Sequence, residues 1–596
     1  MSLRADKPPR RRTWSCVPDE RPRTFGRLRG AFGILALLGG AAAFGGCSSG
    51  DSASPSLPAA VSPVAQPKTQ SALPDLPLPE SPHVLRLTHP QWENSVRDLL
   101  RLDAATGLSS TFPADPTSTG GDFGRDASTL VVGNVLWHEY REAALAAASL
   151  VVDDAAALDK LLPASAKNAG APVPTRIRAF IEDFLPRAFR RPVSAAEIGA
   201  AIAEGDKAAF SDVTSDPFTL RVRWIVTATL QSPYFLYRVE AGEGAVTNGR
   251  VRLGPYELAE KLSYALWGTM PDATLESDAR DGKLATADGL RAVVQQMLDD
   301  PRADAQLLDF HEQLFLIDSY AGVTRQPAVY PKFYVGFGRD AQEDARRTIR
   351  DLVVDRPGTV ADLYTSPVAF VNAPLASLYG IDASEVRELA ANPATFVKVA
   401  MRAPRRGLLS HAGWLAFEGH ATDPATIQRG AYFARHVLCI PLGSPPAAAR
   451  GVDPSKNPAP TDRGRIQATT GTCGNGCHTG KGGVINPLGF GFEEFDSLGQ
   501  LRTKDDGFPI DSTGSIDQMT GAFTDAASLM SVASKSTLTH ACYAAHWSAY
   551  LNGTSHVDPT PSWLAPIAAR SLAGAPVREL VADLVQTDAF LTVSRK

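Results

Sequence analysis

Apolar residues recur at intervals of three and four along most of the chain after residue 81, which is the spacing of one face of an α-helix. In residues 176–192, RIRAFIEDFLPRAFRRP, this stripe consists of Ile177, Phe180, Ile181 and Phe184. Pro186 is expected to kink or end that helix. Similar stripes occur at 254–272, where Leu258, Leu262, Ala265 and Leu266 share a face, and near 291–317, 341–353, 427–438 and 575–590. The pattern predicts a mainly α-helical protein.

Local signals add a helix start and one hairpin. Thr88 is followed three residues later by Gln91, a capping-box pair, and Pro90 suits the first helical turn. Patterns typical of strands are few. Residues 503–511, TKDDGFPID, contain an Asp-Gly turn and predict a β-hairpin.

The length of the chain calls for more than one module. With 596 residues it exceeds what a single hydrophobic core usually serves. Its composition is that of an ordinary globular protein, with 44% hydrophobic and 21% charged residues. The formal net charge of −5 gives no reason to expect a nucleic-acid partner.

The N-terminal part has the pattern of an export signal. Arginines precede the apolar run at 31–46, which is short and rich in glycine and ends in small residues before Cys47. This arrangement resembles a bacterial lipobox and predicts lipidation of Cys47; the alternative is simple signal cleavage nearby. Residues 48–80, rich in Ser and Pro, predict a tether reaching up to roughly 100 Å. We therefore expect a lipid-anchored protein of the cell envelope, on the periplasmic side or the outer-membrane surface.

The richest chemistry lies in GTCGNGCHTG, residues 471–480. Cys473, Cys477 and His478 read C-x-x-x-C-H, one residue longer than the haem c attachment signature. Two thiols would trap the haem, and His478 would be the proximal iron ligand. Met519 is our preferred distal ligand over Met530 because it lies in a polar stretch, although both could serve in packing. Residues 474–476 have the backbone freedom to bulge around a longer spacing.

Two other hypotheses explain the same cysteines. An exported chain matures in an oxidising compartment. If Cys47 is lipidated, Cys439, Cys473, Cys477 and Cys542 remain, enough for two disulfides or one haem and one pair. The second hypothesis is a Cys473–Cys477 disulfide, with Cys439 and Cys542 unpaired or bonded to each other. The third is a zinc site on Cys473, Cys477 and His478 with a further ligand such as Cys439. The expected cofactor is haem c under the first hypothesis, and otherwise none.

The usual catalytic signatures are absent from the sequence. There is no G-x-S-x-G, H-E-x-x-H or phosphate loop. His138-Glu139 and His311-Glu312 lack a second histidine and are interpreted as surface or packing residues. The carboxylates of residues 493–511 lack Ca²⁺-loop spacing; they are Glu493, Glu494, Asp496, Asp505, Asp506 and Asp511. A general acid/base pair among them remains a minor hypothesis.

Several long motifs occur in one order: RLTHPQWENSVRDLL, FLPRAFRRPVSAAEI, QSPYFLYRVE with YELAEKLSYALWGTMPD, RRGLLSHAGWLA with the cysteine segment, and HACYAAHWSAYLNG. Together they make the chain resemble the exported proteins of unknown function, abundant in planctomycetes and myxobacteria, that often accompany cytochrome c domains. These are built from unknown-function families 1587, 1595, 1592, 1588 and 1585. The resemblance covers nearly everything after residue 81.

The resemblance implies a mainly helical exported protein, with Cys473, Cys477 and His478 matching the family's C-x-x-C-H-like segment. The chain departs from the family in its cysteine spacing, in Asn486 replacing a common Asp, and in residues 552–554 standing where L-G-R is frequent. The predicted division is a signal and lipobox, a tether and five modules, at 1–47, 48–80, 81–150, 174–240, 245–382, 400–515 and 520–596.

Two functional hypotheses result. The first is an envelope protein with a cytochrome c-like segment that transfers electrons or performs a haem-assisted oxidation, with a periplasmic or outer-membrane redox partner. Whether it is an enzyme, as a haem-dependent oxidoreductase, is left open. The second is a non-enzymatic envelope protein, stapled by disulfides, that binds a polymer or a protein partner.

Overall fold

The computed structural model describes residues 83–115, 123–207, 216–443, 454–471, 477–479, 482–554 and 559–595. The predicted signal, the lipobox at Cys47 and the tether at 48–80 lie outside these ranges, as does Cys473. The described part is mainly α-helical, which confirms the predicted fold class. None of its helices combines the length and hydrophobicity needed to cross a lipid bilayer.

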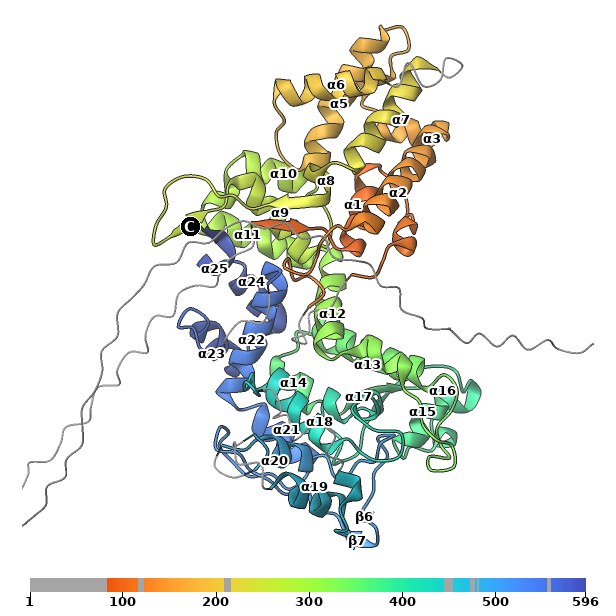
Figure 1. Ribbon diagram of the computed structural model, residues 1–596, viewed down its shortest axis with the longest axis vertical. Coiled ribbons are helices and arrows are strands. Elements are labelled where there is room, and N and C mark those ends of the chain that lie inside the picture. The colour runs from red at the N-terminus through yellow and green to blue at the C-terminus, as the bar shows by residue number, and fades with distance from the viewer. Residues whose placement is uncertain are drawn as a thin grey trace, which may run out of the picture. The chain divides into compact units, whose positions relative to one another are not determined.

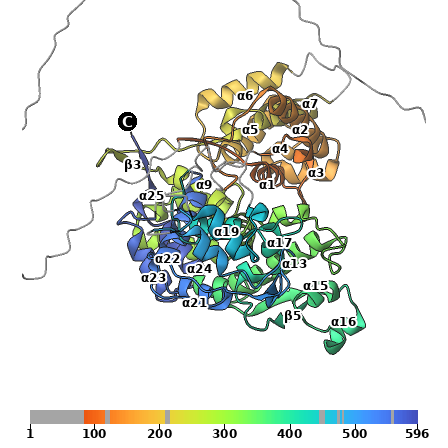
Figure 2. The ribbon, with the colours of Figure 1, turned by 60° about the horizontal axis from the view of Figure 1, so that its bottom comes forward.

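The first eight helices share one hydrophobic core. α2, α5, α6 and α7 pack against one another and lie side by side in both Figure 1 and Figure 2. Buried apolar side chains of α1, α2, α5 and α7 dominate a cluster that we call the first core. The helices are α1 (His89–Leu99), α2 (Asn134–Val152), α3 (Ala155–Leu161), α4 (Ala164–Lys167), α5 (Val173–Phe189), α6 (Ala195–Lys207), α7 (Pro217–Leu230) and α8 (Pro233–Leu236).

Local sequence signals explain where these helices start and end. Thr88 Oγ1 accepts from the Gln91 amide at 3.4 Å while Gln91 Oε1 accepts from the Thr88 amide at 3.0 Å, so the predicted capping box is confirmed. Pro186 does not end α5; the helix continues to Phe189 and stops at Arg190, which has a positive φ of 55°. Pro186 costs α5 the one bond that an N–H there would make to the Glu182 carbonyl, and the helix continues for three more residues.

The next helices begin a second core. The predicted stripe at Leu258, Leu262, Ala265 and Leu266 is buried on α9. The run near 291–317 is divided into two helices around Asp300 and Pro301. The helices are α9 (Pro255–Leu266), α10 (Ala273–Arg280), α11 (Ala287–Asp299), α12 (Arg302–Leu314), α13 (Phe337–Val353), α14 (Val360–Thr365), α15 (Ala373–Leu378) and α16 (Arg387–Ala391).

Shorter helices complete this part of the chain. Apolar side chains between residues 251 and 593, together with Phe123, form one cluster that we call the second core. The helices are α17 (Ala412–Phe417), α18 (Thr426–Tyr432), the π-helical turn η7 (Phe433–Val437), α19 (Asp462–Thr470), α20 (Ile485–Phe490), α21 (Ala526–Ala533), α22 (Thr537–Asn552), α23 (Ala565–Leu572), α24 (Val577–Leu584) and α25 (Asp588–Leu591).

The strands of the described residues form four two-stranded antiparallel sheets. The pairs are β1 (Val84–Arg86) with β2 (Tyr237–Val239), β3 (Arg250–Arg252) with β8 (Thr592–Ser594), β4 (Val368–Val371) with β5 (Val397–Ala400), and β6 (Lys504–Asp505) with β7 (Phe508–Pro509). The last pair is the predicted hairpin. Asp506 and Gly507 turn it with φ values of 47° and 88°, the left-handed conformation that suits such turns.

Candidate functional site

His478 is oriented by a chain of three hydrogen bonds. Thr470 Oγ1 uses its only hydrogen on the Ile466 carbonyl at 2.7 Å, so it must accept from Asn486 Nδ2, also at 2.7 Å. The Asn486 amide oxygen therefore points at His478 Nδ1, 2.9 Å away, and can only accept. His478 consequently carries its proton on Nδ1, which makes Nε2 the nitrogen with a lone pair available for a metal.

The backbone around His478 is held against the start of α20. The Cys477 carbonyl accepts from the amides of Val484 and Ile485, each at 3.0 Å. The His478 carbonyl accepts from the Asn486 amide at 3.2 Å. These bonds hold the carbonyls of both residues against the start of one helix and so restrict the backbone from which the two side chains extend.

Of the predicted haem residues, the structure describes Cys477, His478 and Met519. Cys477 packs against the second core beside His478. Met519 is 5% exposed within the same core, and Met530 is fully buried on α21. Cys473 and the loop at 474–476 lie outside the described residues. The roles of Cys473 as a haem attachment point and of Met519 as the distal ligand stay predictions.

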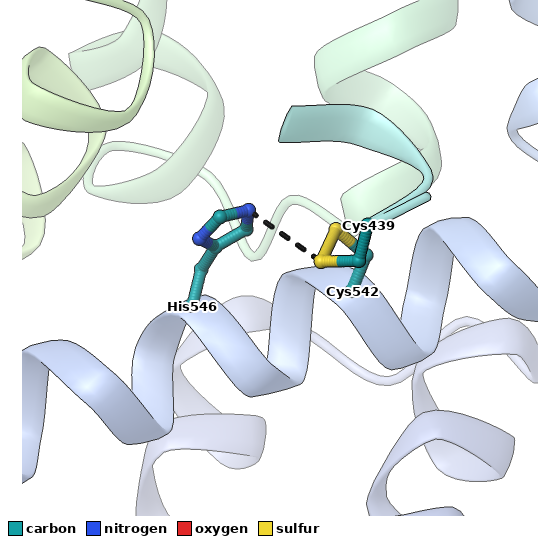
Figure 3. Close-up of side chains that lie close together, drawn as sticks. All are labelled: Cys439, Cys542 and His546. Atoms are coloured by element: carbon teal, nitrogen blue, oxygen red, sulfur yellow. Dashed lines mark hydrogen bonds between the residues drawn. A yellow bond between two sulfur atoms is a disulfide. The ribbon is translucent and has the colours of Figure 1, made fainter. Parts of the chain in front are cut away.

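Cys439 and Cys542 form a disulfide. Their sulfurs are 2.10 Å apart and their Cα atoms 5.2 Å apart, across 103 residues of sequence (Figure 3). Of the two possibilities that the sequence left open for these cysteines, unpaired or bonded to each other, the structure has the second. The zinc hypothesis with Cys439 as the further ligand of Cys473, Cys477 and His478 is wrong for this oxidised chain, because the Cys439 sulfur is already covalently bonded to Cys542.

Helices α18 and α20, which frame this segment, touch backbone to backbone. A Cβ on Gly430 would lie 2.0 Å from the Ile485 carbonyl oxygen, and one on Gly489 would lie 2.2 Å from the Thr426 carbonyl oxygen. Real side chains do not approach so closely, so both positions require glycine. This contact gives the glycines of QRG, residues 428–430, and NPLGF, residues 486–490, a shared structural reason.

Comparison with known protein families gives four matches in succession. Residues 86–153 match the family model PSD3 (DUF1587), residues 176–240 match PSD5 (DUF1595), residues 253–381 match PSD4 (DUF1592) and residues 405–505 match PSCyt3 (DUF1588). The chain carries these four families of unknown function in tandem. No curated protein matches the chain, and no solved structure does. The predicted 1585-like module at 520–596 stays a prediction.

The site just described lies in the DUF1588 match, whose name PSCyt3 points to an association with cytochromes. The segment Cys477–Asn486 and both glycines of the helix contact fall inside it. The matched order of families confirms the resemblance that the sequence motifs indicated. The haem itself is not part of that finding.

Arg429 holds several parts of the DUF1588 segment together, and the sequence alone did not identify it. Its side chain is fully buried and donates to five backbone carbonyls at 2.8–3.3 Å; they belong to Leu415, Glu418, Phe492, Phe495 and Asp496. Burial lowers the pKa of Arg429 to about 10, so it stays charged at neutral pH. The sequence signal that could have identified Arg429 was its place in the QRG motif at residues 428–430.

Two buried carboxyls of the DUF1588 segment share one hydroxyl. Thr426 Oγ1 lies 3.0 Å from both Asp462 Oδ2 and Glu493 Oε1. A hydroxyl has one hydrogen, so the second contact requires a proton on a carboxyl. Burial, and then repulsion from Asp462, raises the pKa of Glu493 to about 7. Arg502 Nη2 contacts Glu493 at 2.9 Å, and Arg502 Nη1 contacts Asp505 at 3.0 Å.

Helix α19 connects this carboxyl pair to His478. Asp462 begins the helix and Thr470 ends it, and Thr470 holds Asn486. Of the carboxyls in the minor acid/base hypothesis, Glu493 and Asp505 are joined through Arg502 in a network with Asp462, which was not foreseen, whereas Asp506 and Asp511 are largely exposed. Both histidine–glutamate pairs of the sequence lie where surface or packing residues are expected. His138 is exposed on α2, and His311 is fully buried with Nε2 2.8 Å from the Tyr543 hydroxyl.

Proposed function

We propose that the DUF1588 segment holds a covalently attached haem c and that the protein transfers electrons, or assists an oxidation, in the cell envelope. Cys473 and Cys477 would form the attachment, His478 Nε2 would bind iron, and Met519 would be the distal ligand. Haem c supplies one-electron chemistry when bound. Lipidation at Cys47 would keep the protein at the membrane, near a periplasmic or outer-membrane redox partner.

The observation that carries this proposal is the tautomer of His478. Thr470 and Asn486 place its proton on Nδ1, the arrangement in which an imidazole Nε2 binds a metal with its other nitrogen donating to a polar partner. Asn486 keeps the acceptor that the common Asp provides, so this departure from the family pattern leaves the support of His478 intact.

The disulfide supports the same proposal from a different direction. Since Cys439 and Cys542 bond to each other, they are not alternative partners for Cys473 and Cys477 in the oxidised chain. The four cysteines can then carry either one haem plus one disulfide, as proposed here, or two disulfides.

The disulfide equally favours the second function, a non-enzymatic protein of the envelope that binds a polymer or a protein partner. In that case Cys473 and Cys477 would also form a disulfide, and the DUF1588 segment would be a stapled scaffold. The two proposals differ in colour and in thiol chemistry, which makes them separable.

The test is the visible spectrum of the exported, purified chain after reduction with dithionite. The haem proposal expects a sharp c-type α-band that survives acid-acetone extraction, and its loss in Cys477→Ser. Asn486→Asp should keep the spectrum and Asn486→Leu should alter the midpoint potential, while His540→Gln, a buried histidine of α22, is the matched control. A colourless wild-type protein without free thiols would overturn electron transfer and favour the stapled scaffold.

A further inference from the structure

A second group of metal-binding atoms lies away from His478, around the disulfide. Cys542 and His546 are four residues apart on α22 and therefore share one face of that helix. Cys439 follows the π-helical turn η7 and reaches the same face. The two sulfurs and one imidazole nitrogen all lie within 4.8 Å of one another, and Cys439 Sγ is 3.8 Å from His546 Nε2 (Figure 3).

The surroundings of this group are largely dry. Cys542 is fully buried, His546 is 2% exposed and Cys439 is 9% exposed. The His436 ring stacks on the His546 ring with centroids 6.1 Å apart. Cys542 Sγ lies 3.6 Å from the His436 carbonyl oxygen. Two thiolates here would need a compensating positive charge because isolated buried charges are costly.

We propose that reduction of the Cys439–Cys542 disulfide converts these three groups into a binding site for one thiophilic divalent cation of the Zn²⁺ class. A dithiol supplies two electrons and two protons: it becomes a cyclic disulfide while Cys439 and Cys542 become thiols. Cation binding then releases the two thiol protons. Two thiolates, a neutral imidazole and a divalent cation sum to zero charge, which suits a buried position.

The existing geometry is close to what the cation requires. Zinc–sulfur bonds of about 2.3 Å and zinc–nitrogen bonds of about 2.0 Å at tetrahedral angles place a sulfur and a nitrogen ligand about 3.5 Å apart. The separation of 3.8 Å between Cys439 Sγ and His546 Nε2 is close to this value. The sulfurs must move apart, and Cys439 can supply that movement since it lies between η7 and an irregular segment, whereas Cys542 is fixed in α22. Three protein ligands leave a fourth position for water or an incoming ligand.

The consequence is that the segment after η7 stays joined to α22 in both redox states, by sulfur–sulfur in one and by a cation in the other. This site uses none of the residues proposed to hold haem. It therefore stands or falls independently of the proposed function.

The experiment uses the exported full chain carrying Cys473→Ser and Cys477→Ser, so that only the group at Cys439 is measured. The protein is reduced anaerobically with a dithiol, freed of reductant and titrated with Co²⁺. We expect one Co²⁺ per chain with a sulfur-to-cobalt charge-transfer band, displaced by Zn²⁺, and no such band before reduction. Zn²⁺ should also protect Cys439 and Cys542 from alkylation, measured by mass spectrometry.

Matched variants assign the ligands. Cys439→Ser in the same background should lose the charge-transfer band, and it subtracts any signal from Cys47. His546→Gln should weaken binding by more than about 100-fold, beyond the roughly 10- to 100-fold that the loss of a supporting hydrogen bond to a metal ligand usually costs. His540→Gln is the control: it is buried on the same helix but bonded to Ser571 and Ser534.

Folding of each variant is checked on its oxidised form by circular dichroism, and Cys439→Ser is compared with Cys542→Ser. The proposal is overturned if the reduced chain binds no Co²⁺, if binding lacks the sulfur band, or if folded His546→Gln binds as tightly as His540→Gln.

Discussion

Helices α1 to α8 and the DUF1588 segment are built from different interactions. The first group buries continuous apolar faces, and its long helices satisfy their own backbone groups. The DUF1588 segment has helices of six to nine residues, joined by irregular chain whose carbonyls are capped by the guanidinium of Arg429. Arg190, which binds carbonyls between α8 and β2, is the nearest counterpart in the first group.

This difference shows where chemistry can be placed. A helix buried along an apolar stripe fixes few polar atoms, whereas irregular chain held by buried hydrogen bonds fixes many. The His478 tautomer and the shared hydroxyl of Thr426 both depend on such bonds. Each of the following substitutions removes one kind of interaction, and its effect on stability shows how far the two regions depend on each other.

The largest effect is expected from Arg429→Met. Five carbonyls lose their donor inside the protein, so we expect the free energy of unfolding to fall by about 5 kcal/mol or more, with protease cleavage appearing first within 405–505. The exposed Arg178→Gln on α5, which loses only its pair with Glu182, should change it by less than about 0.5 kcal/mol. Equal thermal stability of the two variants would show that the capped carbonyls do not stabilise the segment.

Phe184→Ala tests the apolar region in the same way. Phe184 is fully buried and stacks on Phe180 with ring centroids 5.0 Å apart, so its removal should cost about 3 kcal/mol. Hydrogen exchange should speed up in α5 and α7 while α19 and α20 keep their protection. Matching loss of protection in α19 would mean that the two regions unfold as one unit, contrary to the comparison.

Glu493→Gln should change how stability depends on pH. The pKa of Glu493 is raised from its usual 4.5 to about 7, so the folded state keeps a proton that the unfolded state releases. Stability of the wild type is therefore lost as pH rises from about 4.5 to about 7, by about 3 kcal/mol attributable to this group. Thermal unfolding across that range should be flatter for the variant, with the exposed Glu182→Gln as control; parallel curves would contradict the assignment.

The smallest effect is expected at the start of α1. Thr88→Ala removes the side-chain acceptor of the capping box and should cost about 1 kcal/mol, while Thr88→Ser keeps it and should stay close to the wild type. Chemical denaturation of both variants measures the difference. A serine variant as unstable as the alanine variant would attribute the loss to the methyl group instead.

The sequence predicted those features that depend on neighbouring residues. The stripe at Ile177, Phe180, Ile181 and Phe184, the capping box and the Asp506–Gly507 turn each follow from residues within a few positions. The sequence predicted a kink or an end of the helix at Pro186, and α5 instead continues to Phe189.

Long-range polar contacts were beyond the sequence. Arg429 binds carbonyls 63 to 67 residues away, and Asp462 meets Glu493 through a third residue, Thr426. No spacing rule connects such positions. The predicted export and the even number of remaining cysteines allowed the Cys439–Cys542 bond without selecting it. The tautomer of His478 could be inferred only once Thr470 and Asn486 were placed in space.

The pairing of β3 with β8 bears on how the chain folds during synthesis. Arg250–Arg252 finds its partner strand in Thr592–Ser594, at the very end of the described chain, and α11 packs against α24. Val251 therefore cannot be buried by its partner strand, and α11 cannot pack against α24, until the chain through Ser594 has been made. Helices α1 to α8 can pack earlier, since the buried residues of the first core and the strand pair β1–β2 all lie at or before Met270. Folding should accordingly proceed in two steps, and loss of the last ten residues should trap the later part of the chain in a partly folded form.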